Sequence, residues 1–283
     1  MYTTLITPRE LNVLINSNAP LLILDTRHDL MNTDAGTQAY AQAHIPNAFF
    51  MHMDTDLSGE KTGRNGRHPL PDLNLFAEKL RHIGLSHSTQ VVVYDEHNGM
   101  MAARAWWLVR HLGHANVAVL NGGLNAWRSA ELPVTDALPS PHIGDFTAQA
   151  SLNRTVSADD LMAHLNDGVY QIIDARAPER FSGAVEPIDP VGGHIPHARN
   201  HCFVSNLNAD LTFKDADTLR TEWLATLADT PIEQVVNQCG SGVTACHNML
   251  AQHIAGLEGA ALYAGSWSEW CSDEKRPVEK SEG

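Results

Sequence analysis

Short apolar runs alternate with stretches of helical periodicity along this chain. The runs 91–94 and 117–120 are rich in valine, which is typical of short buried strands, and the segment 101–111 between them repeats its apolar residues at helical spacing. A strand, a helix and a second strand in this order predict parallel strands joined by helices. In such a sheet, ligands bind at the carboxyl ends of the strands. The pattern therefore predicts an α/β fold in which parallel sheets are flanked by helices.

The same pattern occurs twice. The segments 22–27 and 172–176 both place an aspartate at the end of an apolar run and an arginine two residues later. Because order and spacing are kept, the sequence predicts two tandem domains, 1–130 and 155–283, joined by a linker over 131–154 that contains several prolines. Three further pairs of segments match at offsets of about 143 to 150 residues, namely 44–48 with 194–198, 91–94 with 235–238, and 122–127 with 265–270.

Two predicted helix starts carry the same signature. Thr7 and Ser157 are N-cap candidates, and an acidic residue follows three positions later in each copy, Glu10 and Asp160. A hydroxyl at the N-cap and a carboxylate three residues on satisfy the first free N–H groups reciprocally. Pro8 occupies the first helical position, which proline favours. We expect a helix to begin directly after each hydroxyl residue.

Composition excludes several classes of partner. The 283 residues carry 19 basic and 33 acidic side chains, and this net charge of −14 argues against nucleic acid or an anionic membrane surface. The first residues lack the basic start and apolar stretch of a signal peptide, and no apolar run approaches the length of a membrane span. The four scattered cysteines include no C-x-x-C pair that would indicate zinc. We expect a cytoplasmic protein without disulfides, and no metal site is predicted.

One loop near the C-terminus carries the candidate chemistry. Residues 239–244 read Cys-Gly-Ser-Gly-Val-Thr between a β-branched run and a segment of helical spacing, so Cys239 should end a strand and Thr244 should open a helix. Gly240 and Gly242 allow positive φ, so the backbone can turn its N–H groups inward, and the helix N-terminus adds partial positive charge. The loop is therefore a candidate anion cradle around a nucleophilic thiol. The alternative is a buried structural cysteine beside a glycine-rich turn.

The first copy differs where this chemistry would occur. Aligning the equivalent strands places Asp95 opposite Cys239 and Glu96 opposite Gly240. The first copy thus has acids where the second has a thiol and a glycine. We expect the first domain to be catalytically inactive.

Together these motifs resemble the tandem rhodanese-domain sulfurtransferases, over essentially the whole chain. The resemblance implies two α/β domains, an inactive first and a catalytic second, that move sulfane sulfur through a persulfide on Cys239 without a cofactor. It also implies a small anionic sulfur donor, and a thiol, a thioredoxin-like protein or cyanide as acceptor. The segments that carry the resemblance are 174–176, 193–196, 239–245 and 265–270 in the second copy, and 44–46, 66–71 and 121–123 in the first.

The cysteine loop is similar to that of the 3-mercaptopyruvate type, because thiosulfate-preferring members tend to carry cationic residues just after the cysteine. Mercaptopyruvate is a monoanion whose ketone can accept a hydrogen bond, and Ser241 offers a hydroxyl. The resemblance implies that Ser241 assists catalysis. The loop residues that it implies for donor binding are Gly240, Gly242, Val243 and Thr244.

The cysteine loop is also compatible with other functions. A thiosulfate:cyanide sulfurtransferase and a non-catalytic sulfur-carrier module both stay open. A cysteine phosphatase is disfavoured because that chemistry needs an arginine at the end of the loop to bind the oxyanion, and Ala245 stands there.

The resemblance also implies residues outside the loop. Arg180 corresponds to the first of two arginines that hold the donor's carboxylate and ketone, and the second would fall near 188–190, where no arginine stands. Arg176 is expected to pair with the acid after its strand rather than with the donor. His68 and Asp54 correspond to a histidine and an acid that assist the thiol from across the domain interface.

Overall fold

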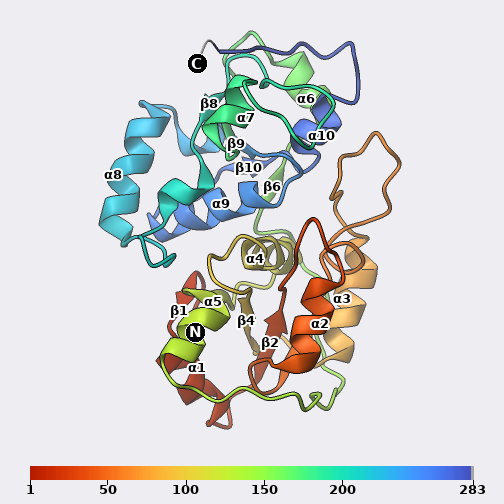
Figure 1. The fold of residues 1–283 in the computed structure, drawn as a ribbon, viewed down its shortest axis with the longest axis vertical. Coiled ribbons are helices and arrows are strands. Elements are labelled where there is room, and N and C mark those ends of the chain that lie inside the picture. The colour runs from red at the N-terminus through yellow and green to blue at the C-terminus, as the bar shows by residue number, and fades with distance from the viewer. Residues whose placement is uncertain (282–283) are drawn as a thin grey trace. The chain divides into compact units, whose positions relative to one another are not determined.

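The structure, a computed structural model, describes residues 1–281 and divides into two compact units (Figure 1). Unit 1 contains residues 1–59, 70–152 and 208–213. Unit 2 contains residues 60–69 and 153–207 and the chain from 214 onward. Each unit therefore includes one short segment from the opposite half of the sequence. Most of the segment expected as a linker, up to residue 152, lies with unit 1.

Unit 1 is built on a five-stranded parallel sheet with strand order β1-β5-β4-β2-β3. The strands are β1 (Leu5–Ile6), β2 (Leu21–Asp25), β3 (Ala48–Phe50), β4 (Gln90–Tyr94) and β5 (Val117–Leu120). The helices are α1 (Pro8–Ile15), α2 (Ala35–Gln42), α3 (Leu73–His82), α4 (Ala102–His111) and α5 (Gly123–Ser129).

Unit 2 repeats this topology, with the parallel order β6-β10-β9-β7-β8. The strands are β6 (Arg154–Thr155), β7 (Gln171–Asp174), β8 (Arg199–Asn200), β9 (Val235–Gln238) and β10 (Ala261–Leu262). The helices are α6 (Ala158–Ala163), α7 (Pro178–Ser182), α8 (Ala216–Leu227), α9 (Thr244–Ile254) and α10 (Ser266–Trp270), with short 3-10 turns η1 (Phe203–Asn206) and η2 (Ile232–Gln234). The α/β fold and the duplication are confirmed.

Each core lies between a sheet and its helices. Val92 on β4 and Val236 on β9 are fully buried at the centres of the two sheets. Trp127 and Trp270 are fully buried at equivalent places, and each indole N–H donates at 2.8 Å to a proline carbonyl a few residues later, Pro133 O or Pro277 O. Burying a large apolar side chain contributes about 1.5–3 kcal/mol, so these aromatic anchors secure the end of each copy as well as its core.

The helix starts confirm the capping prediction. The Thr7 hydroxyl accepts from the N–H of Glu10 and the Ser157 hydroxyl from that of Asp160, and both acids reach back to the N-cap N–H. The helices are short, since the longest in residues 1–281 is α8 with 12 residues, and no helix described there is long and apolar enough to cross a membrane.

The loop after β4 connects this strand to α4 and surrounds the side chain of Asp95. It runs from Asp95 to Met101, two residues longer than the corresponding loop 239–243 of unit 2. The buried Asp95 carboxylate accepts hydrogen bonds from four backbone N–H groups, those of His97, Gly99, Met101 and Ala102, at 2.9–3.2 Å. Burial raises the pKa of Asp95 while these hydrogen bonds oppose the rise. The first copy therefore fills its anion cradle with its own side chain.

Replacing Asp95 with alanine should destabilise the protein, because four buried N–H groups would lose their acceptor. We expect Asp95→Ala to lower the free energy of unfolding by about 2–4 kcal/mol, measured by urea denaturation. The exposed Asp136 provides a matched control, and Asp136→Ala should stay within about 0.5 kcal/mol of the parent. Equal stability of the two variants would show that Asp95 does not hold the loop.

Candidate active site

The thiol of Cys239 lies at the carboxyl end of β9, the central strand of the unit 2 sheet, and is 2% exposed. The connection 239–243 leads directly into α9, which begins at Thr244 as the sequence predicts. Because ligands of parallel sheets bind at the carboxyl ends of strands, Cys239 stands where this fold places its chemistry.

Hydrogen bonds orient the loop around the sulfur. The N–H of Gly242 donates to Cys239 Sγ at 3.1 Å. The carbonyl groups of Cys239 and Gly240 accept from the N–H groups of Trp267 and Ser268, at 2.9 Å each, at the start of α10. With both carbonyls held by α10, the loop is fixed in the conformation in which the Gly242 N–H meets the sulfur.

The two loop glycines have different roles. Gly242 has φ +79°, and a Cβ there would lie 2.3 Å from the carbonyl oxygen of Ala264, so any side chain would force the loop off its neighbour. The expectation of positive φ is wrong for Gly240, which lies outside that region. Gly240 instead borders two guanidinium groups, those of Arg67 and Arg180. Because Gly240 has no side chain, the guanidinium groups of Arg67 and Arg180 can lie close to the backbone there.

Ser241 pairs with His68. The serine Oγ lies 2.8 Å from the histidine Nδ1, and both side chains are more than nine-tenths buried. Residues 60–69 belong to unit 2, so this pair lies within the same unit as Cys239. A hydroxyl two residues from the thiol thus has a partner that can accept or donate a proton, depending on the histidine tautomer. Val243 is buried and precedes α9.

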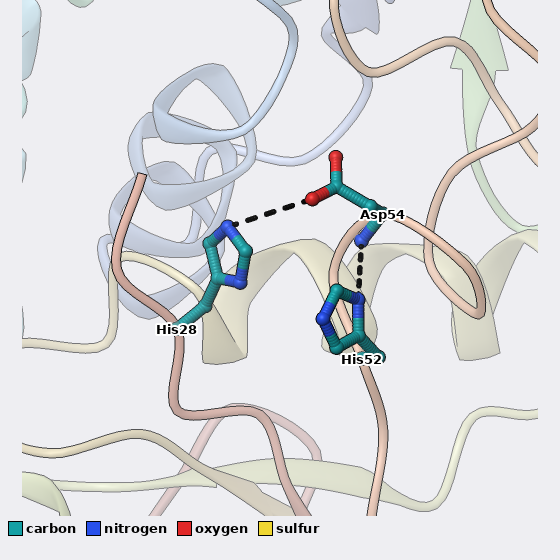
Figure 2. Close-up of side chains that lie close together, drawn as sticks. All are labelled: His28, His52 and Asp54. Atoms are coloured by element: carbon teal, nitrogen blue, oxygen red, sulfur yellow. Dashed lines mark hydrogen bonds and ion pairs between the residues drawn. The ribbon is translucent and has the colours of Figure 1, made fainter. Parts of the chain in front are cut away.

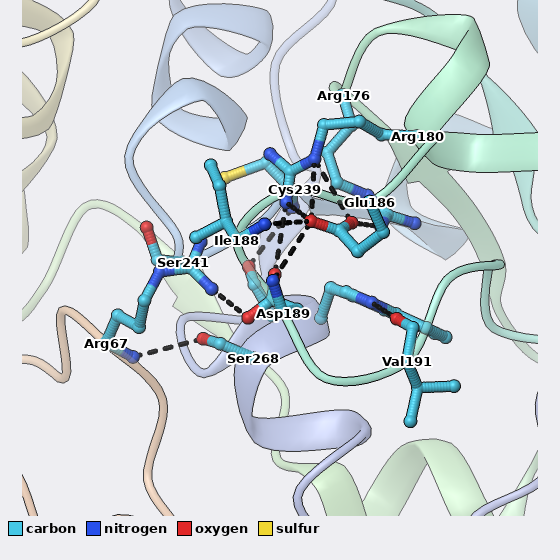
Figure 3. Close-up of polar contacts among 12 residues, drawn as sticks. Arg67, Arg176, Arg180, Glu186, Ile188, Asp189, Val191, Cys239, Ser241 and Ser268 are labelled. Carbon is cyan, nitrogen blue, oxygen red and sulfur yellow. Dashed lines mark hydrogen bonds and ion pairs between the residues drawn. The ribbon is translucent and has the colours of Figure 1, made fainter. Parts of the chain in front are cut away.

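Arg180 lies on α7 and is held by two acids (Figure 3). Its Nε and Nη2 donate to Glu186 at 2.8–3.2 Å, and Nη2 also donates to Asp189 at 3.1 Å. Burial raises the pKa of Glu186, but hydrogen bonds from Arg180 and from two backbone N–H groups outweigh it, so that pKa is lowered overall. Burial raises the pKa of Asp189, against the attraction of Arg67 and Arg180.

Arg67 is the site residue that sequence reasoning missed. Its Nη1 forms an ion pair with Asp189, and its backbone N–H donates to Ser268 Oγ at 3.0 Å. The signal was present: Arg67 stands beside His68 in a motif that carried the family resemblance, and a second arginine was lacking near 188–190. The missing step was the assignment of residues 60–69 to unit 2.

Arg176 pairs with the acid that ends its strand, as predicted. Its guanidinium donates to both oxygens of Asp174 at 2.7–3.1 Å and lies over the Trp267 ring, 4.7 Å from its centroid. Unit 1 repeats the pair with Arg27 and Asp25, at 2.7 Å. The occurrence in both copies indicates a structural role at the strand end.

Asp54 lies in unit 1 beside two histidines (Figure 2). Its Oδ2 is 4.0 Å from His28 Nε2, and its N–H donates to His52 Nδ1 at 3.1 Å. Among residues 1–281 these three side chains are the one group with metal-ligating atoms close together, within 4.8 Å. A tetrahedral zinc site brings such atoms to about 3.3 Å. His52 Nε2 also lies 3.2 Å from Thr33 O, so both its nitrogens have partners and we assign no metal role.

Comparison with known proteins gives matches over most of the chain. The family described as the Rhodanese-like domain matches residues 7–130 and 157–273. A Pseudomonas aeruginosa protein named "Probable 3-mercaptopyruvate sulfurtransferase" is 45% identical over 264 residues, 93% of each chain. SseB of Mycobacterium tuberculosis, provisionally named a thiosulfate sulfurtransferase, is 41% identical over 282 residues, covering 97% of this chain and 96% of its own.

Two solved structures match this chain over most of its length. The 3-mercaptopyruvate sulfurtransferase from Leishmania major superposes with a TM-score of 0.85 at 29% identity, covering 98% of this chain and 76% of its own. SseA from Escherichia coli, described as a 3-mercaptopyruvate sulfotransferase, has a TM-score of 0.80 at 29% identity and covers 94% of this chain and 99% of its own.

The other thiols should be slow to react. Burial raises the pKa of Cys202, and it raises that of Cys271 to about 11, so both thiols are more fully protonated at neutral pH than an ordinary cysteine. At pH 7.5 the thiolate fraction of Cys271 is then on the order of 1 in 3,000. Peptide mass spectrometry after iodoacetamide treatment should show slow labelling of both cysteines, faster as the pH rises and fast in urea. Labelling of native Cys271 at pH 7.5 as fast as in urea would contradict this.

Proposed function

This chain is a tandem rhodanese-family sulfurtransferase, as its motifs predicted, and we propose that it moves sulfane sulfur from 3-mercaptopyruvate to a thiol or cyanide acceptor through a persulfide on Cys239. The observation that carries the proposal is the cradle at the end of β9, where the Gly242 N–H meets Cys239 Sγ at 3.1 Å. A thiolate held by backbone donors can attack a sulfur atom and afterwards carry it.

The reaction divides into two displacements. The Cys239 thiolate attacks the donor's sulfur, an S–S bond forms, and the donor's C–S bond breaks with its electron pair passing to carbon. The resulting pyruvate enolate takes up a proton, and Cys239 holds the persulfide. The acceptor's thiolate or cyanide then attacks the outer sulfur, the S–S bond breaks, and the electron pair returns to Cys239. No metal or organic cofactor takes part in this scheme.

Ser241 supports mercaptopyruvate as the donor. Its hydroxyl lies two residues from the thiol and is positioned by His68 at 2.8 Å, so it can donate to a ketone oxygen as negative charge develops there. The loop residues Gly240, Gly242, Val243 and Thr244 carry no charge of their own. Arg180, whose Nη1 lies beside Gly240, supplies an N–H group for the anionic group of the sulfur donor. These features together favour a keto acid over an inorganic dianion.

The remaining parts of the proposal concern partners and the first domain. We propose a thioredoxin-like protein or a small thiol as the acceptor and a cytoplasmic location. The first domain, 1–130 in the sequence, is proposed to be non-catalytic because Asp95 occupies its cradle. Assistance to the thiol by His68 is supported by its contact with Ser241, and a role for Asp54 stays a prediction.

Cys239→Ser should fold normally and fail to form a persulfide, because a serine hydroxyl is neither acidic enough nor able to accept sulfur in this cradle. After donor treatment, peptide mass spectrometry of the parent should show one added sulfur on Cys239. Cys202→Ser and Cys271→Ser are the matched controls and should retain activity. Sulfur transfer surviving in Cys239→Ser would refute the mechanism, whereas a stable persulfide that no acceptor discharges would indicate a sulfur carrier.

Ser241→Ala should reduce kcat with mercaptopyruvate by roughly 10-fold or more and affect thiosulfate less, since only the keto acid needs a hydrogen bond to a developing oxyanion. Steady-state rates with both donors, using cyanide as acceptor, measure the difference. Equal losses with both donors would mean that Ser241 only shapes the loop. A parent that turns over thiosulfate alone would favour the thiosulfate:cyanide alternative.

A further inference from the structure

The segment 60–69 carries Arg67 to the cysteine loop of unit 2 (Figure 3). Gly66 has φ +82°, and a Cβ there would lie 2.6 Å from the carbonyl oxygen of Gly265, so the backbone approaches as closely as only glycine allows. The next N–H, that of Arg67, donates to Ser268 Oγ at 3.0 Å. These contacts fix the base of the Arg67 side chain beside α10, whose first N–H groups also hold the loop.

Two guanidinium nitrogens converge at the residue after the nucleophile. A Cβ placed on Gly240 would lie 2.9 Å from Arg67 Nη2 and 3.4 Å from Arg180 Nη1. Neither nitrogen has a hydrogen-bond partner within the described chain, residues 1–281. Two such N–H donors from separate arginines, next to Cys239, can each donate to one oxygen of the same carboxylate.

The charges around these nitrogens are balanced. Asp189, with a 3% exposed side chain, bridges the two arginines through Arg67 Nη1 and through Arg180 Nη2 at 3.1 Å. Glu186 binds Arg180 at 2.8 Å, and Asp174 binds Arg176 at 2.7 Å. Three arginines therefore face three carboxylates. The clamp offers directed N–H donors with no excess of positive charge.

We propose that Arg67 is the second cation of the donor site, replacing the arginine that the second copy lacks, and that Asp189 sets the charge of this clamp so that it favours a monoanionic carboxylate over a dianion. The proposal rests on the proposed function, because it assigns the donor's anionic group to the clamp. A monoanionic carboxylate can accept hydrogen bonds from Arg67 Nη2 and Arg180 Nη1 without large repulsion from Asp189. A dianion such as thiosulfate meets about twice the attraction and about twice the repulsion, so a clamp without net charge does not offset its roughly fourfold larger cost of desolvation.

The kinetic test compares variants of the full chain with mercaptopyruvate and thiosulfate at fixed ionic strength. Arg67→Ala should lower kcat/KM for mercaptopyruvate roughly 10- to 100-fold, mostly through KM, and Arg67→Lys should recover only part because ammonium lacks the planar fork. Arg64→Ala removes the same charge from an exposed position on the same segment and should change kcat/KM less than about 2-fold.

The charge assignment has its own variant. Asp189→Asn should raise the ratio of kcat/KM for thiosulfate to that for mercaptopyruvate by roughly 10-fold, because one negative charge beside the clamp is removed. Asp159→Asn, an exposed change of equal charge in unit 2, should leave the ratio unchanged. An unchanged or lowered ratio in Asp189→Asn would overturn the role of Asp189.

A binding measurement separates this inference from the catalytic proposal. In the Cys239→Ser background, calorimetric titration with mercaptopyruvate needs no turnover. Arg67→Ala should raise Kd roughly 10- to 100-fold and Arg64→Ala should not. Binding that depends on Arg67 without turnover by the parent would refute the proposed function and keep the clamp. A Kd and a kcat/KM both within 2-fold of the parent in Arg67→Ala, or no binding by the Cys239→Ser parent, would overturn the clamp.

Discussion

Donation by backbone N–H groups to one acceptor side chain, at the carboxyl end of the central strand, is the interaction on which each unit depends. In unit 1 the acceptor is the carboxylate of Asp95, held by four N–H groups. In unit 2 the corresponding position is Cys239, whose sulfur accepts from Gly242. In unit 1 this connection between strand and helix encloses its own carboxylate, and in unit 2, where it is two residues shorter, we propose that it forms the reactive cradle.

Charge around the cradle is arranged in two layers. Arg176 and Asp174 form a buried pair at the end of β7, and the same pair recurs in unit 1. Breaking a buried ion pair of this kind leaves an uncompensated charge in the interior, so the pair is suited to a structural role. Arg180 and Arg67 share Asp189, and in the donor site that we propose Arg180 Nη1 and Arg67 Nη2 face the ligand. The pair formed by Arg67 and Arg180 is therefore the layer at which we propose that the substrate binds.

Local signals in the sequence predicted most of the fold. Valine-rich runs predicted β4 and β5. A hydroxyl residue with an acid three positions later predicted the starts of α1 and α6. The glycine-rich run predicted that Cys239 lies between a strand and a helix. The contacts of Arg67 with Asp189 and of His68 with Ser241 span 122 and 173 residues. No periodicity or cap signals that residues 60–69 pack in unit 2, because that assignment depends on tertiary contacts alone. The positive φ expected at Gly240 is wrong, because the glycine pattern does not show which glycine takes that conformation; Gly242 has it, and Gly240 lies beside two arginines instead.

The most direct test of the cradle is a crystal structure of the donor-treated protein, solved before any acceptor is added. If the loop stabilises negative charge on sulfur, the outer sulfur of the Cys239 persulfide will lie within about 3.5 Å of two or more N–H groups of residues 240–244. The side chains of Arg67 and Arg180 should then keep their places beside Gly240. An outer sulfur that points away from the loop N–H groups, into apolar surroundings, would contradict the idea that the cradle carries the chemistry.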